Sequence, residues 1–228
     1  MNNPWKNLTD KEPYVLEEDK KFIDKFNSKA KEDHKIDLDL LPEPFIGNED
    51  ADIVLLNLNP GIDKKDKELH KQKEYVDAIK KNLNHEPTEY PFYFLDPKLK
   101  DTSGYKWWQK KLNQLRKDEK PKELASKILC VEYFPYHSKK YKEMNEIPSQ
   151  KYGFYLVEQA LKRKATIIIL RAEKRWWKAV PKLKNYEYYL LKNPQSGTIN
   201  SDNIYKFKGI NYYQEIMAKA KELINRDP

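Results

Sequence analysis

The stretch that decides the fold is Asp52-Ile53-Val54-Leu55-Leu56-Asn57-Leu58-Asn59-Pro60-Gly61. It joins a run of β-branched and aliphatic residues to a sharp Asn-Pro-Gly end, a pattern typical of a core strand that enters a tight turn. Near the other end of the chain, Tyr188-Tyr189-Leu190-Leu191 and then Asn193-Pro194-Gln195-Ser196-Gly197 repeat the arrangement. Ligands of open α/β sheets bind beyond the carboxyl ends of the strands. The two Asn-Pro turns are therefore the first candidates for a functional site.

Two further apolar runs, at residues 127–134 and 165–170, predict two more strands. Helical periodicity appears at about residues 16–34, 64–84, 105–117 and 149–164, and again after Gly209. Alternating strands and helices predict an α/β fold, a three-layer α/β/α sandwich around a central four-stranded parallel sheet. Right-handed crossovers would bring the carboxyl ends of the strands to one edge. We expect a single domain over residues 1–228, with an N-terminal helical extension at about residues 1–40.

The composition narrows the class of partner. The 228 residues carry 44 Lys and Arg against 36 Asp and Glu, a net charge of +8. A positive balance favours polyanions such as nucleic acid, although a Lys-rich surface without such a partner is the alternative. Aromatic residues make up 13% of the chain, which suits base stacking as well as core packing.

Several kinds of protein are disfavoured. Residues 1–8 lack the apolar segment of a signal peptide, and no run approaches the roughly 20 apolar residues of a membrane helix. The one cysteine, Cys130, cannot form an intrachain disulfide. No spacing of His, Cys or carboxylate residues is typical of a metal site, and no Gly-rich phosphate loop is present. We expect a cytoplasmic protein with no membrane association, no metal and no cofactor, and favour a monomer while leaving the oligomeric state open.

In their order and spacing, these motifs resemble those of the uracil-DNA glycosylase superfamily over about residues 44–199. Leu58-Asn59-Pro60-Gly61 is similar to the first catalytic motif, in the Asn-Pro-Gly form of the mismatch-specific branch, and residues 193–197 resemble the second motif. Between them, the aromatic residues 90–94, followed by residues 104–108, look like the segment that stacks on the flipped base. The resemblance implies hydrolysis of an N-glycosidic bond in a base swung out of the helix, because stacked duplex hides that bond.

The resemblance also implies roles for individual residues. Asn59 would orient the attacking water, and Asn193 would donate a hydrogen bond to the departing base as its negative charge grows. Phe94 would stack on the base, with Gly61 and Glu132 completing the base-binding pocket. Pro60, Ser196 and Ile199 would contact nucleic acid. Apart from the resemblance, His137 follows a strand end and could be a general acid or a nucleic-acid phosphate contact, and Lys139, close after it, could also contact phosphate.

The chain departs from the superfamily pattern in three ways. An extra residue, Gln195, lengthens the second motif, so that Thr198 or Ile199 would take the wedge position. Glu132 stands where the superfamily has a base-reading amide. An ionised carboxylate only accepts hydrogen bonds, which suits a base edge with two donors, such as the N–H and NH₂ of a guanine-like base, better than uracil. The acidic residue that activates water in the most active branch is absent, which lowers the expected rate.

Each candidate also has a purely structural interpretation. Asn59 and Asn193 could cap only their own turns, as Asn often does. Glu132 could be an edge charge in solvent, and His137 and Lys139 could lie on a solvated loop. The expected function is a DNA glycosylase-like hydrolase whose substrate base need not be uracil. The alternatives are a catalytically inactive nucleic-acid-binding protein on the same fold and a binder of a small nucleoside-like ligand.

Overall fold

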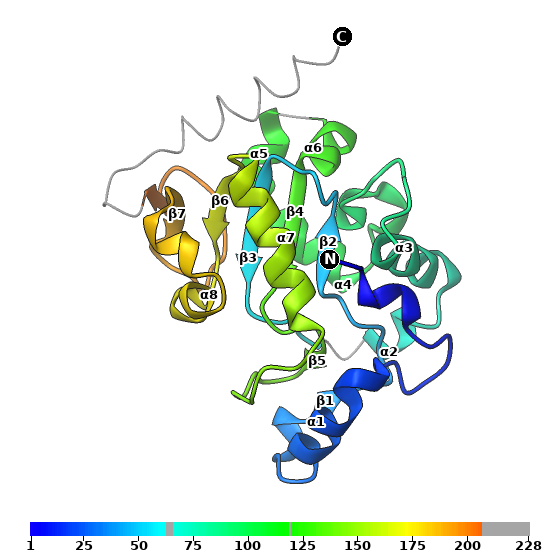
Figure 1. Ribbon diagram of the computed structural model, residues 1–228. Helices are drawn as coiled ribbons and strands as arrows, with labels where there is room; N and C mark the ends of the chain where they lie inside the picture. Colours follow the sequence, from blue (N-terminus) through cyan, green and yellow to red (C-terminus); the bar gives the residue numbers. More distant parts are fainter. Residues whose placement is uncertain (63–65, 119, 207–228) are drawn as a thin grey trace.

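The computed structural model describes residues 1–62, 66–118 and 120–206. Its centre is a six-stranded sheet with the order β2-β4-β3-β6-β7-β8 (Figure 1). The strands are β2 (Phe45–Gly47), β3 (Ile53–Asn57), β4 (Ile128–Glu132), β6 (Thr166–Ile169), β7 (Tyr188–Leu191) and β8 (Ile204–Lys206). The four strands predicted from the sequence are β3, β4, β6 and β7, and neighbouring members of this set pair in parallel.

The sheet is mixed rather than purely parallel, so the prediction of a four-stranded parallel sheet was incomplete. β2 pairs antiparallel with β4 at one edge, and β8 pairs antiparallel with β7 at the other. The prolines before β2 indicate irregular chain, but three residues after Pro44 still pair with β4. Gly47 ends β2 with a φ of +115°, where a Cβ would lie 2.1 Å from the carbonyl oxygen of Ile128. Only glycine fits this close approach.

Helices surround the sheet, in an arrangement compatible with a three-layer sandwich. They are α1 (Glu17–Asn27), α2 (Asp66–Leu69), α3 (Lys73–Leu83), α4 (Ser103–Lys111), α5 (Asn113–Asp118), α6 (Pro121–Lys127), α7 (Gln150–Lys162) and α8 (Glu173–Ala179). Figure 1 shows α7 running along one face of β3 and β4. Its buried residues Tyr152, Leu156 and Ala160 recur at helical spacing, which explains why this face packs on the sheet.

The helix predicted at residues 64–84 is interrupted. α2 ends at Leu69 and α3 begins at Lys73; between them, the His70 ring accepts a hydrogen bond from the Leu41 backbone N–H at 3.0 Å. The helix predicted at 105–117 is likewise divided at Leu112 into α4 and α5. The helix predicted after Gly209 lies outside the described residues.

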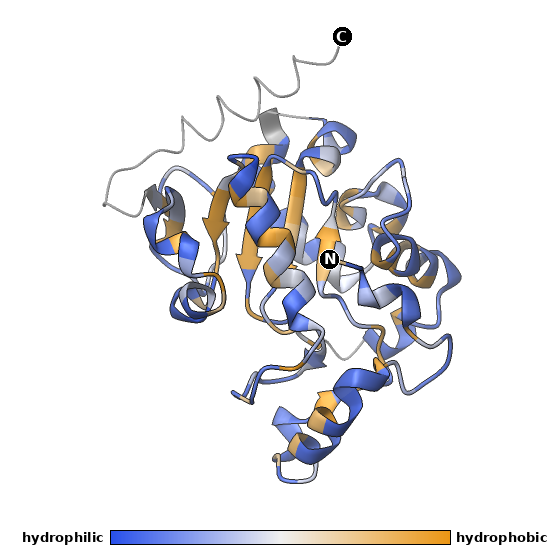
Figure 2. Cartoon of the chain, viewed as in Figure 1, coloured by the Kyte–Doolittle hydropathy of each residue, from blue (hydrophilic) through white to orange (hydrophobic). Residues whose placement is uncertain are grey.

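The core follows the strands, which Figure 2 shows as the most hydrophobic part of the chain. Residues Ile53 to Leu56 of β3 have no exposed surface, as expected for a strand covered on both faces. No helix in the described part of the chain has the length and apolar character to cross a membrane.

The N-terminal segment carries a small ribbon as well as a helix. β1 (Ile36–Asp37) pairs antiparallel with β5 (His137–Ser138), and both lie beside α1 (Figure 1). Asp19 on α1 is buried and accepts hydrogen bonds from the Tyr136 hydroxyl at 2.8 Å and the Ser149 backbone N–H at 3.1 Å. These contacts fasten the segment to the chain that follows β4.

Candidate functional site

A cavity of about 600 Å³ lies at the carboxyl ends of β3 and β4. Its wall is formed by the Asn-Pro-Gly turn after β3, the end of β4, the ribbon strand β5 and aromatic residues from the segment before and within α4. The predicted site residues that line it are Asn59, Pro60, Gly61, Phe94, Glu132, His137 and Lys139. Three chain segments that are far apart in sequence therefore meet where the strand topology predicted.

The second Asn-Pro turn lies beside this cavity without lining it. Asn193 is exposed, and its Oδ1 accepts the backbone N–H groups of Gln195 at 3.1 Å and Ser196 at 3.3 Å. The Ser196 hydroxyl donates to the Asn193 carbonyl oxygen at 3.0 Å. In this structure the Asn193 side chain thus caps its own turn, as the structural interpretation proposed.

Ile199 does not occupy an exposed wedge position. Its side chain is fully buried, and its backbone N–H donates to the carbonyl of Lys111 at 3.0 Å. The turn nevertheless abuts the cavity wall through Gly197, where a Cβ would lie 3.1 Å from Nζ of Lys111. That Nζ lies 4.8 Å from the ring centroid of Trp107, which lines the cavity.

Asn59 has one end of its amide committed to local structure. Nδ2 donates to the Pro60 carbonyl oxygen at 2.9 Å and to Oγ of Ser138 at 3.0 Å. Within the described residues, no donor contacts its Oδ1. The nitrogen fixes the turn, and the oxygen is the atom that could orient a ligand or a water.

Glu132 lies inside the cavity wall, so the interpretation of this residue as a solvent-exposed edge charge was wrong. Asn57 and Glu132 are paired neighbours at the ends of β3 and β4, and Nδ2 of Asn57 donates to Oε1 of Glu132 at 2.9 Å. Oε2 of Glu132 is buried and has no partner among the described residues. Burial raises the pKa of Glu132 to about 8, with a smaller contribution from Glu43; the Asn57 hydrogen bond and Arg171 oppose the shift.

A second buried carboxyl in the wall, Glu43, escaped the sequence analysis. Its Oε1 accepts hydrogen bonds from the hydroxyls of Tyr75 at 3.0 Å and Tyr93 at 2.9 Å. Burial is the largest cause of its raised pKa, against which His137 and the two tyrosines act. The sequence contains one indication that Glu43 is buried. It is a charged residue between two prolines in the otherwise apolar stretch from Leu41 to Ile46.

His137 has a structural role that neither the phosphate-contact nor the solvated-loop interpretation anticipated. The residue is buried, with Nδ1 at 2.8 Å from the Gly61 carbonyl oxygen and Nε2 at 3.0 Å from that of Leu41. A neutral ring can donate to one of the two carbonyls, and an imidazolium can donate to both. As an imidazolium, His137 links the Asn-Pro-Gly turn to the segment that precedes β2, whereas a neutral ring bonds only one of the two.

The aromatic wall centres on Phe94, which is 3% exposed and packs at 4.6 Å from Tyr93 between ring centroids. Its ring reaches so close to Gly104 on α4 that a Cβ there would lie 2.2 Å from Cε1 of Phe94. Trp107 is 37% exposed and extends the aromatic surface to the mouth. The cavity therefore offers flat apolar surfaces beside two carboxyl groups.

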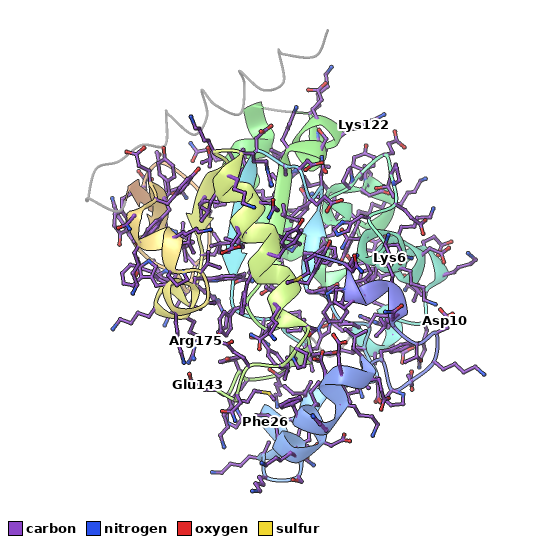
Figure 3. The ribbon with its side chains drawn as sticks, viewed as in Figure 1. Lys6, Asp10, Phe26, Lys122, Glu143 and Arg175 are labelled. Carbon is purple, nitrogen blue, oxygen red and sulfur yellow. The ribbon has the colours of Figure 1, made fainter. Side chains whose placement is uncertain are left out.

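Cations stand around the mouth. Arg171, which follows β6, is exposed and lines the cavity. Lys139 and Lys140 also line it, but both pair with Asp33, at 2.8 and 2.7 Å. The adjoining loop is held by Arg175 on α8, which hydrogen-bonds Glu143 (Figure 3) and lies 5.3 Å from the Tyr141 ring centroid.

The site holds no cluster suited to a metal ion, since no group of three or more His, Cys, Asp or Glu side chains among residues 1–62, 66–118 and 120–206 has that geometry. A comparison of the chain with known protein families, with curated proteins and with solved structures finds no match.

Proposed function

We propose that this protein is a DNA glycosylase-like hydrolase that cleaves the N-glycosidic bond of a flipped-out base. The observation that carries the proposal is the convergence of Asn59, Phe94 and Glu132, from three separate segments, on one cavity. A volume of about 600 Å³ falls within the range of small-ligand sites and can hold a heterocycle.

The cavity offers the parts that such a reaction needs. A base stacked on Phe94 would place its edge toward Glu132 and its sugar toward the Asn-Pro-Gly turn. Oδ1 of Asn59 would accept a hydrogen bond from water and orient it toward the sugar carbon. An amide is too weak a base to take the proton, so the reaction depends on a sugar that already has oxocarbenium character. The departing base takes the electron pair of the broken bond, and the proton lost by the water passes to solvent.

Nucleic acid is the partner that the mouth of the cavity favours. Arg171 is exposed there, has no carboxylate within ion-pair distance among the described residues, and lies near the buried Lys111, whose pKa is lowered by burial first and by Arg171 second. Two neighbouring cations repel each other less when a phosphate lies between them. The net charge of +8 acts in the same direction.

The test is base release. Oligonucleotides with a single uracil, hypoxanthine, xanthine or alkylated base are incubated with the protein, and abasic sites are then cleaved and counted. We expect release from at least one substrate, and a loss of about 100-fold or more in Asn59→Ala, the scale of removing a positioned polar group. The matched control is Asn185→Ala, an exposed asparagine outside the cavity lining. Release that is equal in both variants contradicts the proposal.

The second candidate is a catalytically inactive nucleic-acid-binding protein. It is favoured by the two amides themselves, since Nδ2 of Asn59 and Oδ1 of Asn193 both serve their own turns. Binding that weakens steeply with salt, without any base release, would support this candidate over the hydrolase.

A further inference from the structure

Hydrogen-bond donors and acceptors are unequally matched at the cavity floor, which we define as the side chains of Glu43, Asn57 and Glu132. The donors around these carboxyls are already used: Nδ2 of Asn57 donates to Oε1 of Glu132, and the hydroxyls of Tyr75 and Tyr93 donate to Oε1 of Glu43. Oε2 of Glu132 is buried and has no partner among the described residues. The carboxyl of Glu132 thus keeps one unused oxygen.

The neighbouring groups do not restore the balance. Nδ2 of Asn59 is used by Pro60 and Ser138, and both ring nitrogens of His137 face carbonyl oxygens. No Lys or Arg of the described residues pairs with either floor carboxyl. When Glu132 is ionised, its buried Oε2 is an acceptor without a donor, which is costly unless a ligand supplies the donor.

We propose that the cavity floor reads a base edge with two adjacent hydrogen-bond donors, as in the N1–H and 2-amino group of a guanine-type base, and that such bases are the substrate class. The inference rests on the hydrolase proposed above for the reaction, but recognition of the base edge can be tested by binding alone. The walls supply the stacking surface through Phe94 and Trp107. A base edge that turns a carbonyl oxygen toward Glu132, by contrast, would need this carboxyl in its protonated, donating form.

Binding of this edge should release a proton. The pKa of Glu132 is about 8, so this carboxyl is mostly protonated at pH 7 and must ionise to accept two donors. The groups that face it are Glu43, which favours the protonated form, Arg171, which favours the ionised form, Asn57, and Cys130 of its own strand, with Sγ 4.0 Å from Oε1. Ionisation on binding would release about 0.9 proton at pH 7.

The experiment is a calorimetric titration with guanosine and inosine, which differ only by the 2-amino group. We expect guanosine to bind at least about tenfold more tightly, the scale of one hydrogen bond to a charged acceptor. Titrations in two buffers of different ionisation enthalpy should show proton release for guanosine and none for inosine. Short single-stranded oligonucleotides with one guanine or one hypoxanthine distinguish a base in a nucleic acid from a free nucleoside.

Variants assign the effect to the floor. Glu132→Gln supplies an amide that donates and accepts without ionising, so the preference should fall to within about twofold and the proton release should vanish. Glu43→Gln should weaken the preference in part while leaving the proton release in place. The control is Glu158→Gln, an α7 glutamate paired with Lys182 at 3.7 Å and outside the lining. Thermal unfolding of each variant verifies that it is folded.

Equal affinities, tighter binding of inosine, proton release that persists in Glu132→Gln, or no binding of either nucleoside at millimolar concentration would each overturn the inference. Base release that depends on Asn59 but shows no guanine preference would overturn it and leave the hydrolase standing. A preference for guanine without base release would support recognition of the base by the cavity floor and contradict the proposed hydrolase.

Discussion

Replacement of Gly104 by alanine tests how closely the aromatic wall is packed. A Cβ at this position would lie 2.2 Å from Cε1 and 2.4 Å from Cζ of Phe94, so the ring must move. Because the ring is buried, we expect an overpacking cost of about 1–3 kcal/mol. Alanine regains about 0.5–1 kcal/mol in helix propensity, since Gly104 lies in the first turn of α4. Taking the middle of each range, about 2 against about 0.75 kcal/mol, the free energy of unfolding should fall by about 1 kcal/mol.

Urea unfolding of Gly104→Ala beside the unchanged protein measures this difference directly. Gly61→Ala is the control for stability, because a Cβ at Gly61 would meet no atom within 4 Å. The displaced Phe94 ring should also weaken nucleoside binding, which a titration of the folded variant detects. A Gly104→Ala protein that is as stable as the original, with unchanged ligand affinity, would refute the reasoning about the wall.

Three further predictions concern the carboxyl, the mouth and the second turn. Glu132 has a pKa of about 8 in the fold against an ordinary 4.5, so between these pH values unfolding releases its proton. The free energy of unfolding should therefore fall by up to about 1.4 kcal/mol for each unit that the pH rises in this range. Glu132→Gln should flatten this dependence on pH, and parallel curves for the two proteins would contradict the burial of the carboxyl. Arg171→Ala should weaken oligonucleotide binding and leave thermal unfolding unchanged. It should also reduce the slope of log affinity against log salt concentration by about one. An unaltered slope would mean that Arg171 does not contact a phosphate of the oligonucleotide. Asn193→Ala removes the acceptor for two backbone N–H groups, so the free energy of chemical unfolding should fall by about 1 kcal/mol. Base release should fall less than in Asn59→Ala. An equal fall would mean that Asn193 turns toward the base.

The sequence predicted the parts of the fold that local pattern specifies. Continuous apolar runs identify the four parallel strands, and the topology rule then places the turn after β3 next to the end of β4. The edge strands were missed, because three-residue strands have no readable period and Pro44 argues against pairing. The break between α2 and α3 coincides with a hydrogen bond from the Leu41 backbone N–H to the His70 ring, a contact that no local pattern encodes.

The site was predictable where a residue sits at a strand end and not where its role depends on three-dimensional neighbours. Asn59 lies two residues after β3 and Glu132 is the last residue of β4, and these positions at strand ends place both in the cavity lining. Glu43 became a site residue through Tyr75 and Tyr93, which approach it from other segments. Ile199 illustrates the reverse case, since its position in a motif predicted exposure and its packing buries it.

The pairing of β1 with β5 connects the N-terminal segment to the wall of the cavity. β5 carries His137, which holds the Gly61 carbonyl, and Ser138, which accepts from Asn59. A chain shortened to begin at Pro42 would retain every strand of the large sheet and lose the strand that steadies these two residues. The first forty residues, of which Trp5 and Leu16 belong to the buried core, therefore belong to the smallest fragment in which this part of the cavity wall keeps its shape.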